Sequence, residues 1–194
     1  FFTGGGMLSV IPESGKELWR HAFSVSVPAT ISPVIGGDIV YHSAAYGTGA
    51  RAVRVAKSGD TFRVTELWRK PGQLMNFLST PVYHEGYLYG MFGDKRYGTG
   101  PLMCVELATG EEKWSQPGFG VGQVLLVDGH LLVQDDDGAL VLVKPDPQRY
   151  TQIARYQALN SKSWNGPAIS NGRIYARSTK EGVCLDVTPK ALPK

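Results

Sequence analysis

The sequence predicts an all-β fold, a β-propeller made of four-stranded antiparallel blades. A polar turn followed by a tryptophan occurs as "ESGKELWR" at 13–20 and again as "ATGEEKWS" at 108–115. A hairpin phrase occurs four times along the chain. Glycine, with 24 of 194 residues, exceeds its usual share and indicates many tight turns between short strands.

The hairpin phrase consists of a short apolar strand, a tight turn and an alternating apolar strand. Its four copies are "SPVIGGDIVY" (32–41), "TPVYHEGYLY" (80–89), "QVLLVDGHLLV" (123–133) and "GPAISNGRIYA" (166–176). The turn glycines Gly37, Gly86, Gly129 and Gly172 follow one another at intervals of 49, 43 and 43 residues. Asp-Gly and Asn-Gly predict a hairpin because a type I′ turn needs positive φ at both central residues.

Two further strands are expected in each repeat. Third strands are expected at 7–11, 50–55, 102–107, 139–143 and 182–187. Fourth strands are expected to end at Trp19, Trp68 and Trp114, with Tyr156 taking the place of the tryptophan in the fourth copy. Four short strands every 43–49 residues describe a propeller blade. A strand-rich solenoid is the alternative, although its turns are usually more uniform in length.

The recurring tryptophans are interpreted as structural residues. A blade buries little surface by itself and must pack against its neighbours. An indole at the end of an outer strand offers a large apolar plate and one N–H group, and a glycine turn in the next blade leaves room for it. Trp19, Trp68 and Trp114 are therefore predicted to dock blade on blade, with Gly15 and Gly110 in the turns.

This pattern resembles the tryptophan-docking repeat of the PQQ-like β-propellers, roughly A-x-D-x-x-T-G-x-x-x-W. Cys104 through Trp114 is the closest copy, and Ser9 through Trp19 is a looser one. The copy with Ser58-Gly59 and Trp68 carries an insertion, and the copy from Lys144 to Tyr156 has lost the Thr-Gly pair and the tryptophan. The resemblance extends over almost the whole chain.

The resemblance implies a ring of seven or eight blades, of which this chain would hold about four. Residues 1–194 are expected to form a single propeller domain or half-propeller, with partial blades at 1–20 and 163–187 and complete blades at about 27–69, 75–115 and 123–156. The chain is read as starting inside a repeat, so that any targeting signal would lie upstream. An open arc would expose two apolar blade faces. We expect an N-terminal half or a second copy to complete the ring.

One rim of the propeller is expected to carry the binding site. The turns after the first and third strands are short, whereas the connections after the second and fourth strands are longer. Because strand direction alternates, all the longer loops project from one rim, and loops on a rigid scaffold commonly hold binding residues. The candidates on this rim are His42, Tyr46, Asn76, Phe77, Lys95, Arg96, Tyr97, Phe119, Trp164, Asn165, Arg177 and Lys180. Trp164 either plugs the central channel or stacks on a ligand.

The sequence lacks the residue patterns that are typical of nucleic-acid binding, membrane-spanning helices, metal sites and nucleophilic catalysis. The net charge of +3 comes from scattered residues without a basic run, which argues against nucleic acid as a partner, and no apolar stretch has the length of a membrane helix. "QDDDGA" (134–139) lacks the spacing of a calcium loop and is interpreted as a tight turn with Asp135 and Asp136 in solvent. The histidines show no zinc spacing and no nucleophile elbow is present, so no catalytic residue and no metal ligand is predicted. Cys104 and Cys184 are expected to be free buried thiols.

Three functions are compatible with the sequence. The first is a non-catalytic binding or scaffold propeller, similar to BamB-type proteins, that holds a protein or an extended ligand on the long-loop rim. No cofactor is predicted for it. The second is a fragment of a quinoprotein alcohol or sugar dehydrogenase, which the resemblance would supply with PQQ and Ca²⁺. This chain lacks the adjacent cysteine pair that is typical of those enzymes. The third is the ectodomain of a sensor or kinase. The resemblance implies a periplasmic or extracellular location.

Overall fold

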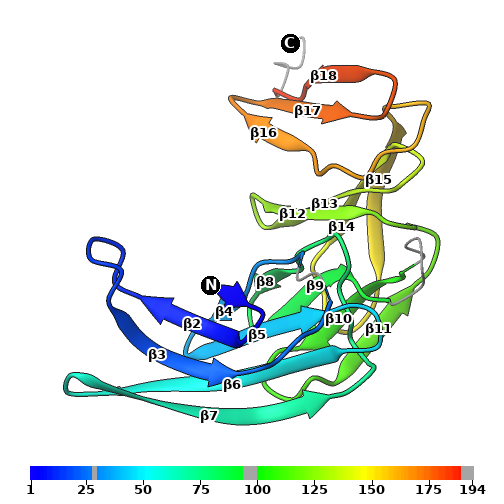
Figure 1. Ribbon diagram of the computed structural model, residues 1–194. Helices are drawn as coiled ribbons and strands as arrows, with labels where there is room; N and C mark the ends of the chain where they lie inside the picture. Colours follow the sequence, from blue (N-terminus) through cyan, green and yellow to red (C-terminus); the bar gives the residue numbers. More distant parts are fainter. Residues whose placement is uncertain (28–29, 94–99, 189–194) are drawn as a thin grey trace.

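Five antiparallel sheets follow one another along the chain and form an open fan (Figure 1). The computed structural model describes residues 1–27, 30–93 and 100–188. It contains β-strands and no helix within these ranges. The fold is therefore all-β and a partial β-propeller, as the sequence predicts.

The first three sheets cover residues 2–116. The first sheet consists of β1 (Phe2–Thr3), β2 (Gly6–Val10) and β3 (Glu17–Ala22). The second consists of β4 (Val34–Gly36), β5 (Ile39–Ala44), β6 (Gly49–Ser58) and β7 (Thr61–Lys70). The third consists of β8 (Val82–His84), β9 (Tyr87–Met91), β10 (Leu102–Glu106) and β11 (Glu112–Gln116). In each sheet a strand pairs with its neighbours in the sequence, which is the up-and-down order of a propeller blade.

The last two sheets differ in the number of strands. The fourth sheet consists of β12 (Gln123–Val127), β13 (His130–Gln134), β14 (Ala139–Lys144) and β15 (Thr151–Gln157). The fifth consists of β16 (Ala168–Ser170), β17 (Arg173–Arg177) and β18 (Gly182–Asp186), which correspond to the first three strands of a complete sheet. No fourth strand pairs with β18 within the described residues.

Tight turns join the first two strands of the second to fifth sheets. The φ angles of Asp128 and Gly129 are 47° and 68°, and the turns at 85–86 and 171–172 show the same pair of positive values. Positive φ at both central residues is what a type I′ hairpin requires, and it explains the Asp-Gly and Asn-Gly sequences. The turn of the second sheet differs, because only Gly37 has positive φ there.

A bulge fixes the position of each tryptophan on its strand. Trp19 pairs with Ser9, Trp68 with Ala52 and Trp114 with Cys104, and the register shifts directly after each of these pairs. The tryptophan strands continue for two or three residues beyond the indole, to Ala22, Lys70 and Gln116, so the expectation that they end at the tryptophan is wrong.

The same bulge identifies the tryptophan position of the fourth sheet. There the register shifts directly after the pair of Leu142 and Ala154. Ala154 therefore occupies this position, and the expectation that Tyr156 replaces the tryptophan is wrong. Tyr156 pairs with Leu140, two residues further along β15. The prediction failed because Tyr156, the aromatic residue nearest to this position in the sequence, was taken as the equivalent of the tryptophan.

Trp68 joins the second sheet to the third. Its Nε1–H donates a hydrogen bond of 2.9 Å to the carbonyl of Leu107, in the turn between β10 and β11. Its ring lies over Gly110 of the same turn, where a Cβ atom would be 3.0 Å from the indole. Gly110 has a φ of 69°, so the position needs glycine both for its backbone and for the space above it.

Trp114 joins the third sheet to the fourth, but its ring packs on a different residue type from the glycine beneath Trp68. Its Nε1–H donates a hydrogen bond of 2.7 Å to the carbonyl of Asp146. The turn of the fourth sheet has no glycine, and the indole instead packs edge-on against Tyr150, with ring centroids 5.8 Å apart. Trp68 and Trp114 thus use the same donor and the same type of acceptor, while the apolar support of the ring differs.

The first junction has no turn beneath its tryptophan. β6 and β7 are ten residues long each, and their hairpin extends beyond the other sheets (Figure 1). This extension accommodates the insertion between Ser58-Gly59 and Trp68. It moves Gly59 away, and nothing lies within 4 Å of a Cβ atom at that glycine. Trp19 packs instead beside Val55 and Val64 of the extended hairpin.

Apolar clusters fill the spaces between successive sheets. The largest contain Tyr41, Leu88 and Val105 between the second and third sheets, and Leu102, Val133 and Val141 between the third and fourth.

Both cysteines are free, as expected, but only Cys104 is buried. Cys184 is exposed, because it lies on the face of the fifth sheet that no other described sheet covers. No helix in the described residues has the length and hydrophobicity of a bilayer-spanning segment.

Candidate partner-binding rim

The long-loop rim is formed by the connections that follow the second and fourth strands of each sheet. Its described residues are 23–27, 30–33, 45–48, 71–81, 92–93, 100–101, 117–122, 135–138, 158–167 and 178–181. The candidate residues Lys95, Arg96 and Tyr97 lie outside the described residues. The other candidates fall into a buried group and an exposed group.

Asn76 is buried and cross-links the second and third sheets. Its side-chain oxygen accepts a hydrogen bond of 2.6 Å from the hydroxyl of Tyr41, and its side-chain nitrogen donates one of 2.7 Å to the carbonyl of Met91. Its backbone N–H donates to the hydroxyl of Ser43 over 2.9 Å. With these bonds the amide holds the loop 71–81 in place, and its side chain is inaccessible to a partner on the rim.

His42 is buried between the first and second sheets. Its ring stacks on Phe2 with centroids 3.2 Å apart and meets Phe23 edge-on at 5.9 Å. Neither ring nitrogen has a hydrogen-bond partner among the described residues. Burial lowers the pKa of His42 from 6.5 to about 3, because the charged imidazolium would lose its hydration. The ring therefore acts as an apolar plate at neutral pH.

Phe119 is also buried. Its ring packs edge-on against Tyr150, with centroids 6.2 Å apart, within the cluster that Trp114 covers. His42, Asn76 and Phe119 thus support the rim from below. Their sequence positions in loops or at strand ends did not reveal this, because burial at a blade junction depends on the neighbouring sheet.

Two aromatic contacts lie on the exposed part of the rim. Tyr46 is 51 % exposed, and its ring meets that of Phe77 edge-on at a centroid distance of 5.5 Å. Tyr46 has a φ of 55°, a conformation that is uncommon for a residue with a side chain. Trp164 is 42 % exposed, and the ammonium group of Lys162 lies 4.7 Å from its ring centroid.

Gln123 links the two loops that carry these aromatic contacts. Its side-chain amide donates a hydrogen bond of 2.9 Å to the carbonyl of Leu78 and another of 3.0 Å to the carbonyl of Trp164. Leu78 follows Phe77 in the chain, so one side chain ties both loops together. We call Tyr46, Phe77, Trp164 and Lys162 the aromatic strip.

The fifth sheet contributes to this rim through its backbone. The Gln134 amide donates to the hydroxyl of Ser163 and to the carbonyl of Asn165, the latter over 3.0 Å. The Ser163 hydroxyl donates to the carbonyl of Arg177 over 2.5 Å. The side chains of Asn165, Arg177 and Lys180 remain exposed.

Sequence reasoning missed Gln123, Gln134, Ser163 and Lys162. The two glutamines stand at the two ends of the apolar hairpin "QVLLVDGHLLVQ" and pair with each other across it. A polar residue that begins and one that ends such a hairpin could have indicated contacts with loops at that rim. Nothing in the sequence indicates that Lys162 lies over Trp164.

The acidic segment 135–137 is part of the fold. Asp135 is buried, accepts a hydrogen bond of 2.7 Å from the backbone N–H of Ala139 and forms a 2.5 Å ion pair with Arg155. Asp136 is half-buried, and its burial raises the pKa of the carboxyl. The expectation that both carboxylates lie in solvent is therefore wrong, whereas Gly138 forms the expected turn with a φ of 90°. Among the described residues, no group of three acidic, histidine or cysteine side chains could hold a metal ion.

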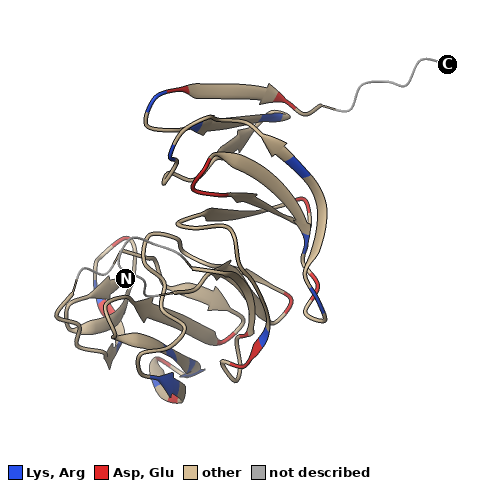
Figure 2. Ribbon diagram, turned by 90° about the vertical axis from the view of Figure 1, so that its right-hand side faces the viewer, with Lys and Arg blue, Asp and Glu red and all other residues tan. Residues whose placement is uncertain are grey.

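Charged residues do not form a field of one sign on the described surface. Basic and acidic positions are both scattered over the ribbon (Figure 2). The exposed part of the rim is thus defined by its aromatic rings more than by charge. A surface of this type suits the anchoring of apolar side chains.

The sheet order, the bulges and the one-sided loops define the chain as a segment of a β-propeller with an aromatic strip on one rim. Comparison of folds leads to the same class and to particular proteins. BamB from Moraxella catarrhalis is similar to 90 % of this chain, with a TM-score of 0.62 and 17 % sequence identity. The computationally designed Ika8 protein is similar to 89 % of it, with a TM-score of 0.58 and 12 % identity.

The chain spans about half the length of these two proteins, 49 % of each. A similarity to a europium-containing methanol dehydrogenase covers 63 % of this chain and 23 % of that enzyme, with a TM-score of 0.42 and 14 % identity. No protein-family model and no curated protein matches the sequence. The similarities to BamB and to Ika8 establish the β-propeller fold.

Proposed function

We propose that the chain belongs to a non-catalytic binding propeller that holds an extended segment of a partner protein on the aromatic strip. The observation that carries this proposal is the pair of exposed aromatic contacts, Tyr46 with Phe77 and Trp164 with Lys162, tied together by Gln123. Exposed tryptophan and tyrosine side chains on a rigid support are typical anchors of protein interfaces.

The support beneath the strip favours binding without rearrangement. Asn76 and Gln134 fix the loops on either side through hydrogen bonds to backbone carbonyls. Loops that are held in this way lose little conformational entropy when a partner binds. The resemblance to BamB-type propellers supports the same function and a periplasmic or extracellular location, which remain parts of the proposal.

Selection from a peptide library followed by NMR mapping tests this function. We expect the selected peptides to shift the signals of Tyr46, Phe77 and Trp164. The Trp164→Ala variant should weaken their binding by roughly tenfold or more, as is usual for a central aromatic anchor. The matched control is Tyr175→Ala, because Tyr175 is an equally exposed aromatic residue on the outer face of the fifth sheet. Peptides that shift only signals away from the rim would contradict the proposal.

We further propose that additional propeller sheets, from more of the same protein or from a second copy, cover the outer face of the first sheet. Phe1 is 76 % exposed on this face, beside Leu8 to which its backbone is bonded. The turn at Gly15 has the hydrogen bond of the Gly110 turn, from the glycine N–H to the residue four positions earlier, but nothing lies within 4 Å above it. Light scattering over a concentration series tests this on the chain alone. We expect self-association, and a monodisperse monomer at high concentration would count against it.

A further inference from the structure

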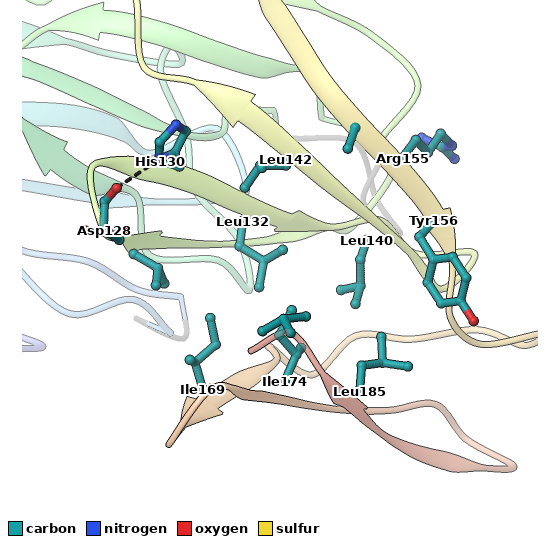
Figure 3. Close-up of a pocket in the computed structure, with 14 residues that line it drawn as sticks. Asp128, His130, Leu132, Leu140, Leu142, Arg155, Tyr156, Ile169, Ile174 and Leu185 are labelled. Atoms are coloured by element: carbon teal, nitrogen blue, oxygen red, sulfur yellow. Dashed lines mark hydrogen bonds between the residues drawn. The ribbon is translucent and has the colours of Figure 1, made fainter. Parts of the chain in front are cut away.

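A cavity lies between the fourth sheet and the fifth (Figure 3). Its volume is about 530 Å³, and most of its walls are aliphatic. Leu132 and Leu140 of the fourth sheet and Ile174 and Leu185 of the fifth line it, and these four side chains belong to the apolar cluster that packs the two sheets together. Pockets of roughly 300–1,000 Å³ with apolar walls are typical of sites for small molecules.

The cavity lies at the junction of the fourth and fifth sheets, which has no tryptophan at the docking position. Ala154 lines it and occupies the position of Trp68 and Trp114 in their sheets. Both of these indoles reach forward to the next sheet. The fourth sheet therefore has the shape of a junction from which an indole has been removed. Apolar cavities that arise by truncation of a large side chain stay dry and bind aromatic molecules.

The acceptor for an indole N–H is retained in the fifth sheet. Trp68 donates to the carbonyl of Leu107, whose own N–H bonds to the carbonyl of Gly86 over 2.9 Å. Val187 stands at the same position, because its N–H bonds to the carbonyl of Gly172 over 2.8 Å. Val187 lines the cavity, and no donor among the described residues bonds to its carbonyl.

We infer that this cavity binds a small planar aromatic molecule with an N–H donor, of which indole is the simplest form. The ring lies beside Ala154, against the leucine and isoleucine side chains that line the cavity, and the N–H donates to the carbonyl of Val187. Entry is from the edge of the cavity that Tyr156 lines, because this side chain is 59 % exposed. The ligand thus replaces the side chain that Ala154 lacks.

Calorimetric titration of the full chain with free indole tests this inference. We expect saturable binding to one site, with NMR shifts of the backbone amides of Leu132, Leu140 and Leu185. 1-Methylindole, which lacks the donor, should bind roughly tenfold more weakly, since it leaves the carbonyl unpaired. Absence of saturable binding, or shifts confined to other parts of the chain, would overturn the site. Equal affinity for both compounds would overturn the role of the Val187 carbonyl.

Substitution of Ala154 provides the second test. The Ala154→Trp variant fills the cavity from within, and we expect it to lose saturable binding of indole. Ala154→Leu fills it in part and should weaken binding if the tryptophan variant does not fold. Ala56→Trp is the matched control, because Ala56 is an exposed strand residue in the second sheet, and binding should stay within about twofold of the unmodified chain.

A chain that ends at Thr188 tests whether the cavity is open to a ligand in the full chain or is filled there by residues 189–194. We expect it to bind indole with the affinity of the full chain. Binding only by the shortened chain would mean that residues 189–194 take the place of the ligand, and would overturn the inference.

Discussion

Trp68 shows how a single side chain holds two sheets of this molecule together. Its ring buries apolar surface against the glycine turn of the third sheet, while its N–H satisfies a carbonyl that the tight turn leaves without a partner. The two contributions differ in size. Burial of a large aromatic ring outweighs the net gain of one neutral hydrogen bond, which is about 1 kcal/mol.

Substitutions of Trp68 separate the two contributions. We expect Trp68→Ala to reduce the free energy of unfolding by about 3 kcal/mol, because it removes the ring and leaves a cavity over Gly110. Trp68→Phe keeps most of the apolar contact and loses the donor, so its loss should be smaller. Chemical denaturation of the three proteins measures this difference. Equal losses for both variants would mean that the hydrogen bond dominates.

His42 should make the stability depend on pH. In the native state burial holds the pKa of His42 at about 3, whereas in the unfolded chain the ordinary value of 6.5 applies. Between these values only the unfolded state binds the proton, so stability falls as the pH is lowered from about 6.5 towards 3, by about 1.4 kcal/mol per unit. The expected effect is absent above pH 7, where the ring is neutral in both states.

The His42→Phe variant tests this assignment. A phenyl ring fits the stack between Phe2 and Phe23 and carries no proton, so we expect a flatter decline of stability between pH 6.5 and 4. The difference between the two proteins at pH 8 reports packing alone and serves as the reference. Parallel pH profiles would show that other groups cause the acid sensitivity.

At the scale of single residues, the docking tryptophans could be predicted from the sequence, but the residue that stands at their position in the fourth sheet could not. Ala154 is recognisable only from the register shift after Leu142, since no feature of alanine marks it. Burial of His42 and Asn76 depends in the same way on side chains of a neighbouring sheet. A repeat pattern describes one blade, and these residues belong to the space between two.

At the scale of elements, the turn between β13 and β14 depends on one buried carboxylate. Asp135 accepts from the N–H of Ala139 across the turn and holds Arg155 of β15. The side chain thus connects a turn and the outermost strand of the fourth sheet. This explains why three consecutive acidic residues are compatible with a tight turn.

Removal of either partner should destabilise this sheet to different extents. We expect Arg155→Met to cost about 3 kcal/mol, because it leaves the Asp135 carboxylate buried without a counter-charge. Asp135→Asn keeps an acceptor for the Ala139 N–H and should cost less. Thermal unfolding of the single and double variants measures both losses and their coupling. Additive losses would show that the two charges do not interact.

Elements were predicted more reliably than their connections. The hairpins followed from turn chemistry, because Asp128-Gly129 and Asn171-Gly172 adopt the positive φ angles that their sequences favour. The extension of β6 and β7 was predicted only in part. The sequence showed an insertion before Trp68, but it did not show that the insertion forms a longer hairpin. The meeting of loops 71–81 and 158–167 at Gln123 was not predictable, because it joins segments of different sheets.

At the scale of the whole molecule, the sheets differ in how much of their surface is covered. The third sheet packs on both faces, against the second sheet and the fourth. Among the residues that the structure describes, the fifth sheet packs on one face only, and its strand β17 alternates between buried and exposed residues. The fifth sheet therefore has fewer tertiary contacts to lose when it opens.

Hydrogen exchange should follow this difference. We expect backbone amides of β17 to exchange at least tenfold faster than those of β10 under native conditions, because opening of the fifth sheet exposes less apolar surface. Mass spectrometry after pulse labelling measures both strands in one sample. Equal protection would indicate that the five sheets open as a single unit.

The forward reach of Trp68 and Trp114 gives the stack of sheets a polarity. Each indole enters the following sheet and none the preceding one, so the two faces of a sheet are as different as the two ends of an arrow. In two copies related by a twofold axis, the same face of the sheet would pack against itself. Such a dimer could not reproduce the contact that Trp68 and Trp114 make with the following sheet. Any contact of the same kind must be head-to-tail, an arrangement that ends only when it closes on itself.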